Sequence, residues 1–498
     1  MSGWRRWAFP AILVALAVAY WIAWRAPAVG TFHDDGVYIV TAKALAEGKG
    51  YRIISHPMEM PQTKYPILLP ALLAGVWKIS PQFPENVSWL KLIPLLSTVI
   101  WLLLSYRLLR EEGVEDWMAK WICCLTAAST WVVYLGTMVL SEAPFAALTT
   151  ASLLLLRRAE RNGSARLLAG AAACAGLAFH TRTLGMALIV ATPLYLAARR
   201  KWQEASLFAV LAGALAAPWV WWVLSQPHTA AAVDAYYSRE NYQGWNILTN
   251  FTLPQKIDIL FSNLTLVLFA PGMLAGIPAK GALVLPALAV GIACLAGLWK
   301  HRYSLYAVLL LAYGAIVCAW AWLPSRFVVP FLPLLLWFAV DAVAGRTRTR
   351  RWAMAAVTVA SLGSLSYGLL ETVRLGYPTP PMPVAEGDGW DRLEALLQRT
   401  RETTGPEAVL AGNLDPLYYL YTGRKAVRGF AAEPYHLLYS PGTAEAPANP
   451  LGSPERFVKG LQAVGVTHWL ETPNSTFAEG VPLHRLLESV QQAYPGWL

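Results

Sequence analysis

The sequence predicts an all-α polytopic membrane protein of about eleven transmembrane helices, with a small extracytoplasmic α/β domain at its C-terminal end. Its 498 residues are 56% hydrophobic and 14% charged, and the mean hydropathy is +0.41, whereas a soluble domain carries roughly 25% charged residues. Apolar runs of about 17 to 20 residues, enough to span a bilayer core of about 30 Å, recur up to about residue 371. The sequence beyond that point is mixed and polar. These observations exclude a wholly soluble enzyme, a disordered protein and a secreted disulfide scaffold.

The membrane module is predicted to cover residues 1–371, with two long outer loops at about 25–90 and 225–281, and residues 372–498 are predicted to form the C-terminal domain. The first apolar run is interpreted as an uncleaved span, because no small-residue cleavage site follows it. Segment 258–278 is apolar but interrupted by Pro271 and Gly272, which favours a re-entrant or interfacial helix. The spans themselves are expected at roughly 8–24, 91–107, 118–135, 143–156, 167–180, 185–198, 205–224, 282–299, 303–322, 327–344 and 352–371.

Clusters of basic residues mark one face of the membrane. Groups such as Arg157/Arg158 and Arg199/Arg200 lie in short connections between apolar runs, as the positive-inside rule describes for cytoplasmic loops. The N-terminus is therefore predicted to be cytoplasmic, and an odd number of spans then places the C-terminal domain outside. The net charge of +10 reflects this topology, so no nucleic-acid partner is expected. The five cysteines all fall in apolar spans, in a spacing that suits neither a metal site nor a disulfide framework.

The C-terminal part alternates helix and strand signals. Leucines at helical spacing predict a helix over 390–398, and apolar runs at 408–410 and 464–470 predict buried strands. This alternation is typical of a small α/β domain.

Carboxylates and arginines at span ends gather on the outer face of this topology. Asp34 and Asp35 follow the first span, Glu142 lies where the third and fourth spans meet, and Arg182 and Arg326 lie in outer turns. Charged groups at the edge of the membrane are costly and tend to be functional. Next to the acidic pair, apolar residues at helical spacing over 36–47 predict an amphipathic helix at the membrane surface.

This combination suits an anionic lipid whose head group is transferred. A carboxylate within reach of an acceptor hydroxyl acts as a general base, and cations hold a phosphate and stabilise it as it leaves; the candidate cations are Lys64, Arg182, Arg239 and Arg326. Each residue also has a simpler interpretation. The acidic pair could cap the following helix, Lys64, Arg182 and Arg326 could anchor lipid head groups or snorkel, and Arg239 could be ordinary loop polarity.

Four motifs in order resemble a known family. The run HDDGVYIVTAKALAEGKGY at 33–51 contains the acidic pair, Tyr38 and a Gly-x-Gly-Tyr ending; KYPILLP at 64–70 contains Lys64 and Tyr65; Ser-Glu stands at 141–142; RFVVPFLP stands at 326–333. Together they resemble the GT-C fold glycosyltransferases, among them the protein O-mannosyltransferase type (glycosyltransferase family 39), the lipid A aminoarabinose transferases and the Rgt-like sugar transferases of bacterial envelopes. The resemblance covers residues 1 to about 371.

The resemblance implies a GT-C-like fold and a transferase of the bacterial inner membrane that works on the periplasmic face. It implies a polyprenyl-phosphate sugar donor and inversion at the anomeric carbon, with Asp34 as the catalytic base. Asp35 would orient the acceptor or shape the site, and Glu142 would bind acceptor, water or a divalent cation. Tyr38 and Tyr65 are further site candidates. No metal ligand set is evident, so a divalent cation stays open, as do the sugar (a hexose or a pentose) and the acceptor (a lipid, a glycan or a protein).

A transporter or flippase of lipid-linked sugars is the main alternative function, and a binding or scaffold protein of envelope assembly is a second. Transporters often contain inverted repeats and polar groups near the bilayer midplane. The sequence contains no evident repeat, and its acidic residues lie at an interface.

Overall fold

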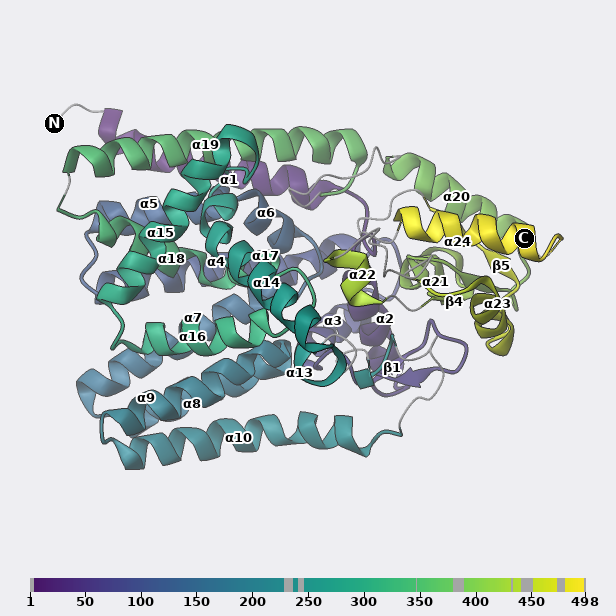
Figure 1. Ribbon diagram of the computed structural model, residues 1–498, viewed down its shortest axis with the longest axis horizontal. Helices are drawn as coiled ribbons and strands as arrows, with labels where there is room; N and C mark the ends of the chain where they lie inside the picture. The colour runs from purple at the N-terminus through teal and green to yellow at the C-terminus, as the bar shows by residue number, and fades with distance from the viewer. Residues whose placement is uncertain are drawn as a thin grey trace.

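The computed structural model describes residues 4–227, 236–240, 246–345, 347–378, 389–430, 433–439, 451–472 and 480–496. It consists mostly of helices, arranged as a bundle beside a smaller C-terminal region that contains short strands (Figure 1). In this view the C-terminal region lies at the right, and the loop that joins α9 to α10 lies at the left. The predicted all-α membrane bundle is confirmed.

The bundle contains six helices that are long and apolar enough to cross a membrane, or seven if one bent pair is a single span, within the described ranges. The predicted total of about eleven stays a prediction. The helices of the bundle are α1 (Trp4–Arg25), α4 (Val87–Glu111), α5 (Asp116–Ala128), α6 (Thr130–Thr137), α7 (Glu142–Asn162), α8 (Ala165–Thr181), α9 (Met186–Ala198), α10 (Trp202–Ser225), α14 (Leu253–Leu274), α15 (Val284–Lys300), α16 (Leu305–Cys318), α17 (Ser325–Val328), α18 (Leu332–Ala342) and α19 (Thr347–Leu375), with 3-10 turns η1 (Thr183–Gly185), η2 (Gly281–Leu283) and η3 (Val329–Phe331).

Local sequence explains where α7 ends and α8 begins. Gly163 ends α7 in the left-handed region at φ 62°, and the Ser164 side chain accepts a hydrogen bond from the N–H of Leu167 at the start of α8. A glycine and a serine are favoured at these two capping positions. The resulting tight connection makes α7 and α8 antiparallel neighbours, as the predicted spans 143–156 and 167–180 require.

Two predicted segments differ from the structure. The span expected over 118–135 is two helices, α5 and α6, which meet at 65° because Ser129 has an extended backbone. The interrupted segment expected over 258–278 is one continuous helix, α14, up to Leu274. The turn after it packs against the backbone of Ala360 and Ser361 in the middle of α19. The start of α14 contacts the C-terminal region through Asp258 and Tyr435, and the end of α15 contacts the end of α18 through Lys300 and Asp341. The chain therefore passes from one end of the bundle to the other over α14 and α15 together.

The first long loop folds against the bundle as α2 (Asp34–Ala46), a two-stranded antiparallel ribbon of β1 (Arg52–Ile53) and β2 (Met60–Pro61), and α3 (Leu68–Ile79). The helix predicted over 36–47 is confirmed, but its apolar face, which was expected to lie against the membrane surface, is covered by protein. Val37, Val40 and Ala44 are all buried, because α21 of the C-terminal region covers the face that α3 leaves open.

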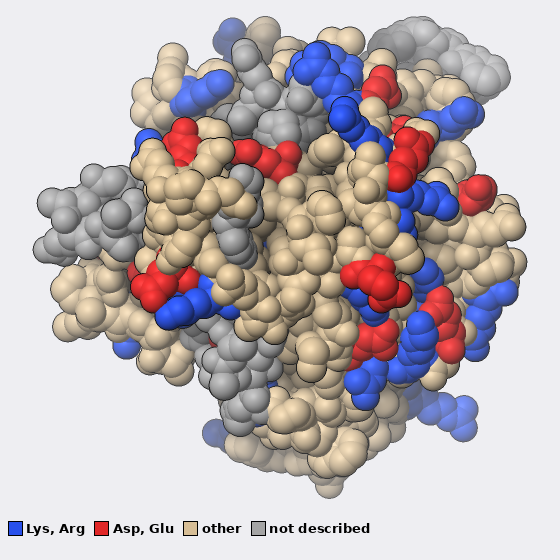
Figure 2. Space-filling model, turned by 90° about the vertical axis from the view of Figure 1, so that its right-hand side faces the viewer, with Lys and Arg blue, Asp and Glu red and all other residues tan. Residues whose placement is uncertain are grey.

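The described part of the C-terminal region combines five helices with a parallel three-stranded sheet in the order β4-β3-β5. Its first helix begins at Trp390, where the sequence predicts a helix, and two of its strands overlap the predicted strands at 408–410 and 464–470. Figure 2 views the molecule from this end and shows acidic and basic side chains interspersed over it. The elements are α20 (Trp390–Thr403), β3 (Val409–Ala411), α21 (Asp415–Thr422), β4 (Lys425–Val427), α22 (Pro434–Leu438), α23 (Pro454–Ala463), β5 (His468–Trp469) and α24 (Gly480–Ala493), and the short α13 (Ile247–Asn250) belongs to the second long loop.

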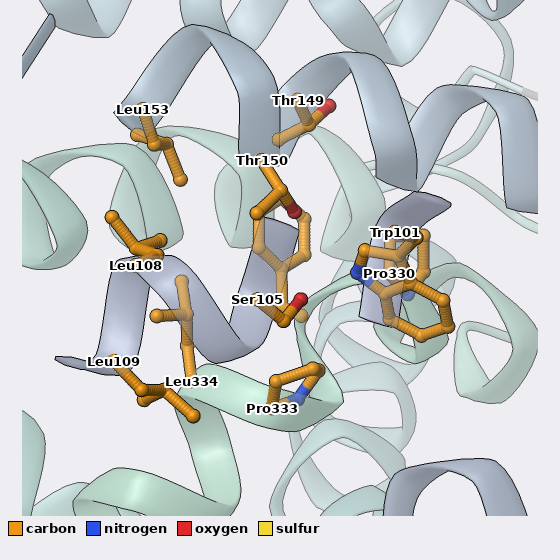
Figure 3. Close-up of a pocket in the computed structure, with 11 residues that line it drawn as sticks. Trp101, Ser105, Leu108, Leu109, Thr149, Thr150, Leu153, Pro330, Pro333 and Leu334 are labelled. Atoms are coloured by element: carbon orange, nitrogen blue, oxygen red, sulfur yellow. The ribbon is translucent and has the colours of Figure 1, made fainter. Parts of the chain in front are cut away.

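The interior of the bundle contains a cavity of about 10 Å³ between α4, α7 and η3. Figure 3 shows leucine side chains on one side of it and Trp101 with Pro330 on the other, with the hydroxyl groups of Ser105 and Thr150 between them. A cavity of this size is at the lower limit for holding one water molecule. The cavity is therefore a packing feature and has no room for a sugar or a phosphate.

Candidate active site

The charged residues predicted on one face meet where the bundle adjoins the C-terminal region. Asp34 is the first residue of α2 and Glu142 the first of α7, while Arg182 follows α8 and Arg326 lies in α17. Each side chain therefore stands at a helix end, where the chain leaves the bundle. The predicted gathering of Asp34, Glu142, Arg182 and Arg326 is found in the structure.

Asp34 is held by two partners. The hydroxyl group of Tyr65 donates to its Oδ1 at 2.6 Å, and Nη2 of Arg326 donates to its Oδ2 at 2.7 Å. The Asp34 side chain is 14% exposed, so it is the carboxylate of the group that solvent or a substrate reaches. Its place in the first turn of α2 also favours the ionised form.

Glu142 lies deeper and contacts two guanidinium groups. Its Oε1 is 2.6 Å from Nη1 of Arg182 and 3.2 Å from Nε of Arg326. Its side chain is only 2% exposed. Neither of its oxygens accepts a well-aligned hydrogen bond from the described residues, so the contacts are ionic and the oxygens keep acceptor capacity for a ligand.

Ser141 completes the group; it stands in the Ser-Glu motif at 141–142, of which only Glu142 was predicted to be a site residue. Its hydroxyl group lies 3.0 Å from that of Tyr38 and accepts a hydrogen bond from Nη1 of Arg182 at 3.0 Å. The rings of Tyr38 and Tyr65 are 5.1 Å apart. The contacts therefore form a closed ring of seven side chains: Tyr65, Asp34, Arg326, Glu142, Arg182, Ser141 and Tyr38.

Aromatic side chains hold the two guanidinium groups in place. The carbon Cζ of Arg326 lies 4.7 Å from the ring centre of Phe32 and 5.3 Å from that of Phe327, and Cζ of Arg182 lies 5.3 Å from Phe327. Cation–π contacts of this kind strengthen where water is excluded. Neither phenylalanine was predicted to be a site residue, although Phe32 directly precedes the motif at 33–51 and Phe327 lies within the motif at 326–333.

The electrostatics keep Asp34 ionised. Burial alone would raise the pKa of Asp34, but the charges of Arg326 and Lys64 and the hydrogen bond from Tyr65 outweigh it and hold this pKa below its usual value of 3.8. Burial raises the pKa of Tyr38 above its usual value of 10.0, so its phenol stays protonated. The free site thus presents a carboxylate and neutral hydroxyl groups.

Asp35 points away from this ring. The backbone N–H groups of Gly30 and Phe32 donate to its two oxygens at 2.6 and 3.1 Å, and its side chain is buried. Burial raises the pKa of Asp35 to about 6, against the stabilising effect of those backbone N–H groups. Of the two roles expected for Asp35, these contacts favour shaping the loop that leads into α2.

The remaining predicted cations lie beside the ring. The ammonium group of Lys64 is buried and lies 3.8 Å from the ring centre of Tyr236 and 5.1 Å from that of Tyr65. Nη1 of Arg239 donates to the carbonyl of Val223 at 2.7 Å, so this contact turns Arg239 toward the end of α10. The structure therefore brings Lys64 next to Asp34 and gives Arg239 a place at the edge of the site.

The C-terminal region holds the start of α2. Nε2 of His33 is 2.8 Å from Oδ1 of Asp415, and the hydroxyl group of Tyr237 donates to Oδ2 of Asp415 at 2.9 Å. His33 has a positive φ of 68°, a strained backbone that persists only where surrounding contacts fix it. The sequence alone does not indicate this pair, because its members are 382 residues apart.

The donor set does not fit a divalent cation. Asp34 and Glu142 share the guanidinium group of Arg326, and Arg182 and Lys64 stand close by. A metal ion would have to displace a cation from each carboxylate while facing the others. Elsewhere in the described ranges, no three histidine, cysteine or acidic side chains form a metal-binding group.

These features define a class: a polytopic membrane protein with a ring of charged and hydroxyl side chains at one end of its helical bundle. Residues 64–222 match the family model described as dolichyl-phosphate-mannose-protein mannosyltransferase. The chain is similar to ArnT from Cupriavidus metallidurans. In the structure bound to undecaprenyl phosphate, the identity is 13% and the TM-score 0.57, over 92% of this chain and 89% of ArnT. In the apo structure the values are 12% and 0.56, over 85% and 86%.

No curated protein matches the chain. The low identity with ArnT limits that comparison to the fold, and the family model adds a sequence match over α3 to α10. The chain has the GT-C glycosyltransferase fold, and the predicted resemblance to this group is confirmed.

Proposed function

We propose that this protein is a membrane glycosyltransferase that moves a hexosyl or pentosyl residue from a polyprenyl phosphate to an acceptor hydroxyl group. The observation that carries the proposal is the buried ring in which Arg326 joins Asp34 to Glu142. It combines a base with cations for a phosphate in one site. The match to the mannosyltransferase model and the undecaprenyl phosphate named with ArnT support this donor class.

The first step of the proposed mechanism is an exchange of partners. The donor phosphate competes with the two carboxylates for Arg326, while Arg182 and Lys64 offer further positive charge. Guanidinium groups bind phosphate through paired N–H groups. When Arg326 turns to the phosphate, Asp34 loses the cation that lowers its pKa while burial continues to raise it. Donor binding thereby makes Asp34 a stronger base.

The second step is an inverting displacement. Asp34 takes the proton of the acceptor hydroxyl group, and the acceptor oxygen attacks the anomeric carbon from the face opposite the phosphate. The bond between that carbon and the phosphate oxygen breaks, and its electron pair leaves with the polyprenyl phosphate. The extra negative charge on the phosphate is stabilised by Lys64, Arg182 and Arg326, which lie where that charge develops.

The other members of the ring position the substrates. Glu142 has acceptor capacity for a substrate hydroxyl group, and Tyr65 orients the carboxylate of Asp34. Because the donor set does not fit a divalent cation, the proposed reaction needs no metal, and EDTA should leave the rate of transfer within about twofold. By the positive-inside rule, the site and the C-terminal region lie on the periplasmic face of a bacterial inner membrane.

The experiment uses the purified protein in liposomes with a panel of labelled polyprenyl-phosphate sugars and a fractionated envelope extract that contains lipids, glycans and proteins. The readout is released polyprenyl phosphate and labelled acceptor. Asp34→Asn should abolish both, whereas the matched control Asp258→Asn, an exposed carboxylate on α14 at the same end of the molecule, should leave them unchanged. A donor that moves intact between leaflets without release, in wild type and Asp34→Asn alike, would replace this proposal with the flippase alternative.

A further inference from the structure

A second polar cavity lies at the end of the bundle opposite the candidate active site. Its volume is about 290 Å³, and the ends of α4, α7, α9 and α15 and the start of α16 line it. Helix α7 connects the two places, since Glu142 begins it and Arg157 lines the cavity. At 1.5 Å per residue, they are about 22 Å apart along the helix axis. The cavity is therefore separate from the ring around Asp34.

Most charges in this cavity are paired, and one basic residue is left over. Arg157 donates to both oxygens of Glu112 at 2.5 and 3.1 Å, and Lys300 binds Asp341 at 2.8 Å. The guanidinium group of Arg199 instead donates to the hydroxyl group of Tyr195 at 2.8 Å. No acidic side chain of the described ranges forms an ion pair with it. The cavity thus has a surplus cation at its rim.

The start of α16 adds a second anion-binding element. Ser304 caps this helix, and its side chain accepts a hydrogen bond from the N–H of Ala307, which leaves its O–H free to donate. Ser304, Leu305 and Tyr306 all line the cavity. The N-terminus of a helix carries partial positive charge and favours a phosphate.

The residues around the cavity are of the kinds found at the level of lipid head groups. Trp299 and Tyr303 are 70% and 79% exposed, and Arg302 stacks on both rings at 5.1 and 4.6 Å. Exposed tryptophan and tyrosine at helix ends are typical of the boundary between membrane and water. On α9 and α16, Leu194 and Leu311 are 59% and 67% exposed, which suits contact with lipid.

We propose that this cavity binds the phosphate of an anionic membrane lipid in the leaflet opposite the active site. Arg199 is the principal ligand, with Ser304 and the N-terminus of α16 on the other side. A basic pocket between helix ends on the cytoplasmic side is the arrangement that suits anionic head groups. A lipid fixed here would join α9 and the start of α16 at the end of the bundle where Glu112 links α4 to α7 and Asp341 links α18 to α15.

The test is native mass spectrometry of the delipidated, full-length protein, titrated with phosphatidylglycerol, with phosphatidylcholine and with inorganic phosphate. We expect one phosphatidylglycerol to bind, and Arg199→Gln to weaken it about tenfold or more, as loss of a charge-assisted hydrogen bond implies. The matched control Arg158→Gln lies on the same end of α7 but pairs with Glu111 outside the cavity, and it should bind like wild type. Thermal melting and the transfer assay check that both variants are folded.

The three titrations distinguish a lipid phosphate from free inorganic phosphate as the ligand. Phosphatidylglycerol binding that inorganic phosphate does not displace supports a lipid ligand. Binding of inorganic phosphate without phosphatidylglycerol would overturn the lipid assignment. Equal binding of phosphatidylcholine, or no effect of Arg199→Gln, would overturn the proposal as a whole.

Discussion

Replacement of Arg326 is the most informative perturbation, because this residue contacts both carboxylates of the site. Its Nη2 is 2.7 Å from Asp34 and its Nε 3.2 Å from Glu142. In Arg326→Lys the positive charge stays, but a single ammonium group cannot reproduce the planar fork. Loss of one charge-assisted contact is worth about 1.5–3 kcal/mol, and about 1.4 kcal/mol is tenfold in rate. We therefore expect kcat/KM to fall about 10- to 150-fold.

Arg326→Gln adds a signature in pH. In the proposed mechanism, transfer requires ionised Asp34. The pKa of this carboxylate lies below its usual value of 3.8 in wild type, so protonation of Asp34 should not reduce kcat/KM between about pH 5 and 7. Without the guanidinium group, burial remains and raises that pKa. The acid limb of the profile should then move up into this range, so that the variant loses activity as pH falls.

The assay is polyprenyl phosphate release in liposomes at subsaturating donor, measured over this pH range. Arg302→Lys is the control, because Arg302 is exposed at the opposite end of the bundle and stacks on Trp299 and Tyr303. A lysine variant of Arg326 within twofold of wild type, or a glutamine variant with an unshifted acid limb, would refute the reasoning.

Three further predictions concern the support of the site. Burial raises the pKa of Asp35 to about 6 from 3.8, so Asp35 contributes on the order of 3 kcal/mol to the free energy of unfolding below about pH 4, and this contribution is lost as pH rises through 6. Tm should therefore fall between pH 4 and 6 in wild type and fall less in Asp35→Asn. The same dependence of Tm on pH in both proteins would contradict this prediction. Asp415→Asn should lower transfer about tenfold or more by loosening the start of α2, with donor binding measured in parallel; full activity would show that the contact is not needed. Gly36→Ala should destabilise by about 1–3 kcal/mol because its Cβ would lie 2.8 Å from that of Pro416, whereas Gly75→Ala, with open space around it, should not; equal melting of the two variants would refute this.

The sequence predicted that the charged residues gather, because the membrane topology alone determines on which face each end of a span lies. Once basic clusters place one set of loops inside, Asp34, Glu142, Arg182 and Arg326 must share the other face. Hydrophobic periodicity also predicts most helices, since each must hide an apolar face from water or present one to lipid.

What the sequence could not predict depends on contacts across long separations. The burial of α2 results from its cover by α21, and the pairing of His33 with Asp415 joins opposite ends of the chain. The bend at Ser129 between α5 and α6 is marked in the sequence only by the hydroxyl residues Thr126, Ser129 and Thr130. Such residues also occur within straight helices, so they did not predict the bend. The contact of Arg326 with both Asp34 and Glu142 also depends on the positions of side chains in space, which the sequence pattern does not specify.

The central claim is that Asp34 acts in the chemical step. The most direct measurement is a single-turnover time course of polyprenyl phosphate release by wild type and Asp34→Asn, with donor binding determined separately in the same liposomes. We predict donor binding within a few-fold of wild type and a release rate about 10²–10⁴ lower, the range for loss of a general base. Release at the wild-type rate, or a defect confined to donor binding, would contradict this account.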